Sequence, residues 1–268
     1  MIKKAIFHHH IPTNSKALII GLIAGFGGGL ASLGGGSLVI PLLMGWLSLS
    51  PVAARGTAIV VSVFSAGMGI VMYHHANLLD FPVAIWVALP SLFITPIAAS
   101  WSEKWPESRL KTGFGMVVII GGFLVIIHNV AGSGFTVAEH WRIPYLLMIG
   151  LVEGLVAGIV GVSGGPVLAP LFVIGLGMPQ QLAQGCSMAA RLPAILSGSW
   201  ENWRLGNIHF AIVPGLALGA LTGAWIGSKV AFWMPEHTLQ LLFALLLIIL
   251  GSHYLYQGLI RRKKLPHP

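Results

Sequence analysis

The chain has 268 residues, of which 56% are hydrophobic and only 8% are charged. Soluble globular proteins carry about 25% charged residues, so this composition excludes a water-soluble globule and favours a helical membrane protein. The net charge of +8 does not indicate nucleic-acid binding, because basic residues gather near the two ends of the chain, as they do on the cytoplasmic flanks of membrane proteins. The single cysteine, Cys186, excludes an internal disulfide and a cysteine-based metal cluster.

Apolar runs predict helices along almost the whole chain. In the first half we expect helices near 17–32, 37–48, 51–73, 82–100 and 109–128. In the second half we expect helices near 145–161, 166–177, 180–203, 208–230 and 237–259. The prediction is an all-α polytopic membrane protein with about eight long spans and two short half-helices.

The two halves of the chain repeat each other at an offset of 129 residues. The break Gly34–Ser37 recurs as Ser163–Pro166, and the glycine at position 21, which begins a stripe at four-residue spacing, recurs at position 150. Such stripes let helices approach closely in lipid, so we expect them mainly to serve packing. The predicted organisation is a cytoplasmic tail at 1–15, a first repeat at 16–130, a connector at 131–144, a second repeat at 145–259 and a basic cytoplasmic tail at 260–268.

The orientation of the repeats depends on whether the short helices cross the membrane or turn back. If they cross, the two copies are parallel, and basic residues lie on both sides of the membrane. If they turn back, the copies are inverted, and only Arg142 and Lys229 remain opposite the termini. The positive-inside rule therefore favours inverted repeats in the cell (inner or plasma) membrane, with both termini cytoplasmic.

Each glycine-rich break places the start of a short helix inside an apolar region. A helix start presents unpaired N–H groups and partial positive charge, which suit an anion. Two such starts can face one small anion near the midplane; the alternative is that the glycines only allow helices to cross. The substrate-binding candidates at the breaks are Gly35, Gly36, Ser37, Gly164, Gly165 and Pro166.

Three ionisable residues in the spans are candidates for function, since charge at bilayer depth is costly. Glu153 is the only acid well inside a span, so it is a candidate to carry a coupling proton, with a purely structural carboxyl as the alternative. Arg191 lies midway along its span and Arg55 near the start of another. A guanidinium matches oxyanion geometry, so both are substrate-contact candidates. A structural ion pair for Arg191, with Glu201 as a weak partner, and an interfacial anchor role for Arg55 stay open.

Asn77 and Asn207 end matched helices in the two halves. Asparagine is common at helix ends and turns, so a structural cap is favoured over a role as a polar gate. The nearby histidines have no carboxylate at ligand spacing, and we therefore expect no metal site.

Several of these segments together resemble a known family. They are Gly21–Gly25, Gly34–Leu42, Arg55–Thr57 and Asn77 in the first half, and Gly150–Pro170, Gln184–Ser187 and Asn207–Ile208 in the second. With them the chain resembles the TauE/SafE family, which includes sulfite and organosulfonate exporters. The second break departs from the first, because Ser163 replaces Gly34 and Pro166 replaces Ser37, which makes the second site less polar.

The resemblance implies a secondary transporter that exports sulfite or an organosulfonate, whereas the residues alone indicate only a small oxyanion. No nucleotide-binding P-loop occurs, so the energy would come from an ion gradient, the membrane potential or the substrate gradient. A membrane-embedded enzyme is disfavoured, since neither G-x-S-x-G nor H-E-x-x-H is present. A passive anion channel and an accessory subunit stay open. The expected partners are the anion, the lipid bilayer and a coupling proton or other ion; the glycine stripes leave a homodimer open, and no cofactor is expected.

Overall fold

The computed structural model describes residues 13–33, 35–102, 106–131, 136–160 and 165–263, and over these ranges the chain is helical without strands. The first half contains α1 (Thr13–Ala31), α2 (Gly35–Trp46), α3 (Pro51–His75), α4 (Phe81–Ser102) and α5 (Glu107–Ala131). The second half contains α6 (Arg142–Val160), α7 (Gly165–Leu176), α8 (Gln180–Arg204), α9 (Val213–Trp233) and α10 (Glu236–Lys263). The predicted all-α fold is confirmed, and α10 continues into the segment predicted as a tail.

Seven of the long helices have the length and apolar composition of membrane spans: α1, α3, α4, α5, α6, α9 and α10. The eighth long helix, α8, has 25 residues but is much less apolar, because polar side chains interrupt it. The short helices α2 and α7 have 12 residues each, or about 18 Å at 1.5 Å per residue, which is too short to cross a bilayer core of about 30 Å.

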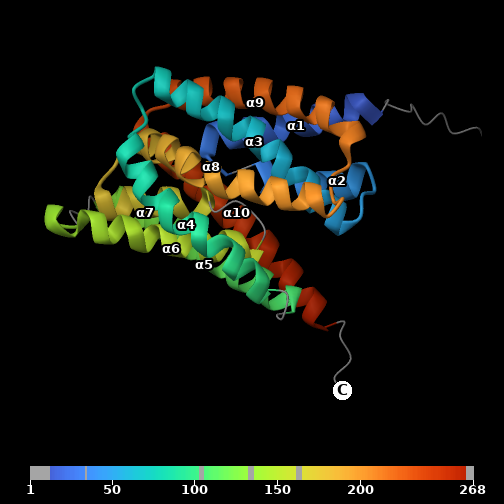
Figure 1. Cartoon of the computed structure of the whole chain (residues 1–268). Helices are drawn as coiled ribbons and strands as arrows, with labels where there is room; N and C mark the ends of the chain where they lie inside the picture. The colour runs from blue at the N-terminus through green and yellow to red at the C-terminus, as the bar shows by residue number, and fades with distance from the viewer. Residues whose placement is uncertain (1–12, 34, 103–105, 132–135, 161–164, 264–268) are drawn as a thin grey trace, which may run out of the picture.

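The pair α1–α2 forms a hairpin that enters and leaves at the same end of the bundle. The start of α1 lies beside the start of α9, since Gly215 packs against Asn14 and Ala17. The start of α3, which closely follows α2, is also at this end, because Thr57 Oγ1 accepts a hydrogen bond from the His209 backbone N–H at 3.0 Å, just before α9. In Figure 1, α1 begins, α2 ends and α10 ends toward the same side of the view.

The pair α6–α7 forms the matching hairpin at the opposite end of the bundle. Arg142 at the start of α6 makes an ion pair with Asp80, before α4, at 3.8 Å. The Asp80 backbone N–H also lies 3.3 Å from Cys186 Sγ in the first turns of α8, the helix that follows α7. The start of α6 and the end of α7 are therefore at one end.

The two halves interlock. Helix α1 packs along α9, and α6 packs along α4. The first helix of each half is therefore covered by the fourth helix of the other half. The glycine stripe of α1 makes this approach possible, because a Cβ at Gly21 or Gly25 would lie 2.2 or 2.3 Å from a backbone oxygen of α9. The stripe therefore packs within the chain, as the sequence suggests.

Equivalent helices of the two halves run in opposite directions. On α5 and α10, Gly115 faces Leu255, whereas Gly122 faces Ala244, so these helices are antiparallel. Helices α3 and α8 are antiparallel as well, since Gly56 faces Asn207 at one end and Gly69 faces Met188 further along. This course is what inverted repeats require, and the orientation across a membrane remains a prediction.

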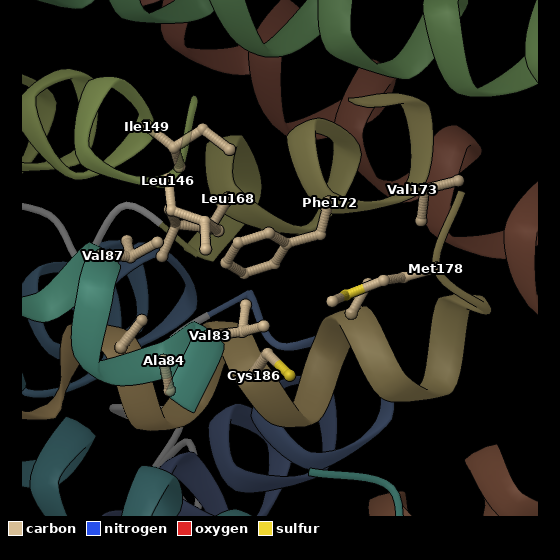
Figure 2. Close-up of a cluster of buried hydrophobic side chains, with 12 residues drawn as sticks. Val83, Ala84, Val87, Leu146, Ile149, Leu168, Phe172, Val173, Met178 and Cys186 are labelled. Atoms are coloured by element: carbon tan, nitrogen blue, oxygen red, sulfur yellow. The ribbon is translucent and has the colours of Figure 1, made fainter. Parts of the chain in front are cut away.

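Two equivalent apolar cores follow from the interlocking. Figure 2 shows the core that α4, α6, α7 and α8 build around Phe172 and Cys186. The other core is built by α9, α1, α2 and α3. Their members correspond at the offset of 129: Val83 with Ile212, Val87 with Leu216, Leu146 with Ala17, and Ile149 with Ile20.

The two ends of the bundle differ in charge. The end with the starts of α1, α3 and α5 and the ends of α8 and α10 carries Lys16, Arg55, Arg109, Lys111 and Arg204. We call it the basic end. The opposite end, where α6, α8 and α10 start, carries Arg142 and Lys229 among the described residues.

Candidate functional site

The tips of the two helix hairpins meet at a buried arginine. Arg191, midway along α8, donates a hydrogen bond from Nη1 to the Ser32 carbonyl at 2.7 Å, just after α1. Ser32 also donates from its hydroxyl to Ser187 Oγ at 3.1 Å. The backbone of Ser32 has φ +50°, a left-handed conformation that ends α1 and that is uncommon for a residue other than glycine. Through these two bonds the residue that follows α1 contacts one side of α8.

Gly165, the first residue of α7, completes this contact. A Cβ at this position would lie 2.0 Å from the Ser32 carbonyl oxygen and 2.2 Å from Arg191 Nη1. Only glycine leaves room for the Arg191–Ser32 hydrogen bond. Pro166 follows in the first helical turn, where its missing N–H costs nothing.

An acid from another helix joins Arg191. Glu153 on α6 is 0% exposed and Arg191 is 1% exposed, and the two charges act on each other. The sequence treats these residues as separate candidates, and their proximity comes from tertiary packing. Glu201, the weak partner considered for Arg191, pairs instead with Arg204 at 3.4 Å on the exposed end of α8.

The other predicted binding residues do not all gather here. Arg55 is exposed near the basic end, where its charge acts on Tyr254 of α10, so the structure does not bring it to Arg191. Helix α2 begins at Gly35, and the structure describes the backbone of the three candidates at 35–37 but not their side-chain environment. The candidate Gly164 lies outside the described residues.

Asn77 and Asn207 lie in turns at opposite ends of the bundle. Asn77 has φ +56° and follows α3, which fits the structural role of an asparagine at a helix end. Each turn contacts the third helix of the other half, since Gly56 packs on Asn207 and Gly185 packs on Leu78. These contacts hold the halves together at both ends.

Several polar residues near the arginine were not among the site residues predicted from the sequence. Ser32 and Ser187 contact each other, and Tyr73 of α3 donates its hydroxyl to Gln184 Oε1 at 2.6 Å. The same Tyr73 hydroxyl lies 3.0 Å from the Gly29 carbonyl of α1. The signal that could have found Gln184 and Ser187 is their spacing from Arg191, because all three fall on one helical face.

This arrangement suits a small oxyanion. It combines one buried guanidinium, two hydroxyl groups and the start of α7, all of which can donate hydrogen bonds to oxygen atoms. Glu153 offers a carboxylate whose charge acts on Arg191. Across the described ranges, no three histidine, cysteine or acidic side chains are grouped as a metal site.

Comparison with known proteins adds the family. A family model described as "Sulfite exporter TauE/SafE" matches residues 17–254. The chain belongs to the TauE/SafE family. This TauE/SafE protein is 25% identical to the "Probable membrane transporter protein YunE" of Bacillus subtilis, over 90% of its own length and 97% of that relative. It is 29% identical to the "Sulfite exporter TauE/SafE family protein 3" of Arabidopsis thaliana, over 58% of its own length and 29% of the relative. Family membership and the seven apolar helices make it a multi-pass membrane protein of a transporter family.

Proposed function

We propose that this TauE/SafE protein is a secondary transporter that exports a small oxyanion, sulfite or an organosulfonate, from the cytoplasm. The observation that carries the proposal is the buried Arg191 at the meeting point of the two hairpin tips. A guanidinium that is 1% exposed at mid-bundle is costly in a membrane, and its usual role there is in function. The family description favours sulfite among the small oxyanions.

Glu153 supplies a coupling mechanism. In the empty transporter the carboxylate balances the charge of Arg191. An anion that binds Arg191 competes with Glu153, so the released carboxylate takes up a proton, and one proton travels with each anion. A sulfite dianion and one proton carry a net charge of −1, so an inside-negative membrane potential drives their export.

The duplicated arrangement of helices supports an alternating-access mechanism. Each apolar core is built around one hairpin, and the two hairpins enter from opposite ends and touch near Ser32 and Gly165. Rocking one core against the other would expose this contact to one end at a time. The basic end would face the cytoplasm in the cell membrane, in line with the positive-inside rule.

The test is the flux of radiolabelled sulfite in proteoliposomes that contain the purified protein. Wild-type flux should saturate with sulfite, respond to the membrane potential and rise when the proton concentration is higher on the sulfite side. Glu153→Gln should remove the dependence on the proton gradient, because the amide does not titrate. Glu201→Gln, an exposed acid on α8, is the matched control and should behave as wild type.

Each result separates one part of the proposal. Flux that never saturates would replace the carrier with a channel. A proton dependence retained in Glu153→Gln would remove Glu153 from coupling. The absence of flux for sulfite and for a panel of sulfonates would overturn the substrate class.

A further inference from the structure

One face of α8 is polar from the start of the helix to its middle. Gln180, Gln184, Ser187 and Arg191 are spaced at i, i+4, i+7 and i+11, which places them on successive turns of the same face. All four are buried, with exposed fractions of 0 to 1%. This α8 face therefore connects the central Arg191 with the end of the bundle opposite the basic end.

The glutamine side chains in the outer part of the α8 face have polar atoms without hydrogen-bond partners. Neither Nε2 nor Oε1 of Gln180 has a partner among the described residues, and the same holds for Nε2 of Gln184. Buried amides without partners are rare and costly, so such groups call for a ligand, for water or for a second conformation.

Contacts at the outer end show where the α8 face leads. The Gln180 backbone N–H donates to Glu236 Oε1 at 2.5 Å, and Gln240 Nε2 donates to the same oxygen at 2.8 Å. Both partners lie in the first turns of α10, at the end of the bundle. At the inner end, Tyr73 holds Oε1 of Gln184, so the amide nitrogen is the group left to donate.

The equivalent face of α3 differs, because at the offset of 129 it carries Pro51, Arg55, Ala58 and Ser62, of which Pro51 and Arg55 are exposed. The Ser62 hydroxyl donates to the Ala58 carbonyl at 3.0 Å, and the Ser65 hydroxyl donates to the Ser62 carbonyl at 3.2 Å. These hydroxyls are satisfied within their own helix, so burial costs them little. The unsatisfied polar groups are therefore a property of the α8 face rather than of both repeats.

We propose that the α8 face is the closed half of the transport path between Arg191 and the end opposite the basic end, and that its amide and hydroxyl donors guide a hydrated oxyanion along it. This inference rests on the proposed function for its substrate. When the path opens, water and the anion supply the partners that Gln180 and Gln184 lack here. With the basic end in the cytoplasm, this half of the path faces the outside.

The first test is chemical labelling with methanethiosulfonate ethylsulfonate, a thiol reagent that is itself a small sulfonate and does not cross membranes. Gln184→Cys and Gln180→Cys should react in right-side-out vesicles and not in inside-out vesicles, and methanesulfonate should slow the reaction. The native Cys186 is the control, because it lies at the same depth in the apolar core shown in Figure 2 and should stay unmodified. Mass spectrometry of the protein identifies the modified residue.

A second test does not depend on cysteine variants. Gln180→Leu removes two unsatisfied atoms, so it should raise the melting temperature by a few degrees while lowering anion flux about tenfold. Gln181→Leu is the matched control, since Gln181 Nε2 donates to the Ala231 carbonyl at 2.9 Å and its loss should lower the melting temperature. A glutamine with a purely structural role would behave like Gln181.

The outcomes separate this inference from the proposed function. Labelling at positions 180 and 184 without sulfite flux would support the path and overturn only the substrate. Sulfite flux without labelling at either position, or with labelling only in inside-out vesicles, would overturn the path and leave the transporter standing. A lower melting temperature for Gln180→Leu would also overturn the path.

Discussion

The third helices of the two halves, α3 and α8, occupy equivalent places and carry different chemistry. Position 191 of α8 corresponds to Ser62 of α3 at the offset of 129. The Ser62 hydroxyl donates to a carbonyl of its own helix, whereas Arg191 donates across the bundle to Ser32. The helices of the two repeats are thus arranged symmetrically, but the charged residues of the site occur only in the second repeat.

The first helices of the hairpins show the same asymmetry. Glu153 on α6 corresponds to Ala24 on α1, and both are fully buried. Ala24 packs in the apolar core that α1, α2, α3 and α9 build, whereas the acid on α6 acts on the charge of Arg191. A duplicated fold can therefore hold one asymmetric site, because the first half supplies packing at the positions where the second half supplies charge.

The largest expected effect tests the two third helices directly. Arg191→Gln should lower sulfite flux by about a hundredfold or more, because it removes the charge that faces the anion. Ser62→Ala, the equivalent change on α3, should stay within about twofold of wild type. The measurement is initial flux in proteoliposomes at matched protein content.

Arg191→Lys refines this prediction. It keeps the charge but loses the planar donor fork, so it should retain part of the flux with a higher KM. An equal loss of flux in the α3 variant and in the α8 variants would show that both helices serve transport alike, and would contradict the difference between them.

A smaller effect is expected at the glycine that adjoins Arg191. Gly165→Ala places a methyl group 2.2 Å from Arg191 Nη1, so it should displace the guanidinium, lower flux about tenfold and cost about 1–3 kcal/mol of stability. On α3, Gly67 has no atom within 4 Å of a built Cβ. Gly67→Ala should therefore leave flux unchanged and add up to about 1 kcal/mol of stability. Thermal unfolding beside the flux assay measures both, and a Gly165→Ala protein as stable and active as wild type would contradict the close contact.

The smallest effect concerns the hydroxyl pair. Ser32→Ala and Ser187→Ala each remove the bond between the two side chains, which join at 3.1 Å. Position 187 corresponds to Ala58, so Ser187→Ala makes α8 resemble α3. A double-mutant cycle should give a coupling energy of about 1 kcal/mol, or about 2–4 °C in melting temperature. Additive effects of the two changes would mean that the hydroxyls act independently.

Most of the helical fold could be predicted from the sequence. The long apolar runs, the offset of 129 and the paired glycine breaks predicted eight long helices and two short ones, and the described helices match them closely. These features are local, because helix length follows hydrophobic run length and a break follows from glycine. The sequence also marked Arg191 and Glu153 as costly charges within apolar spans.

Only the tertiary structure decided which residues meet. The sequence separates Ser32 from Arg191 by 159 positions, and no local pattern relates them. Their contact arises because the hairpins enter from opposite ends and their tips meet beside α8. Arg55 was also a substrate-contact candidate in the sequence, with an interfacial anchor as its alternative, and it lies near the basic end, since depth in the bundle depends on where each helix starts. Local periodicity therefore fixed the helices of this protein, and long-range packing assembled its site.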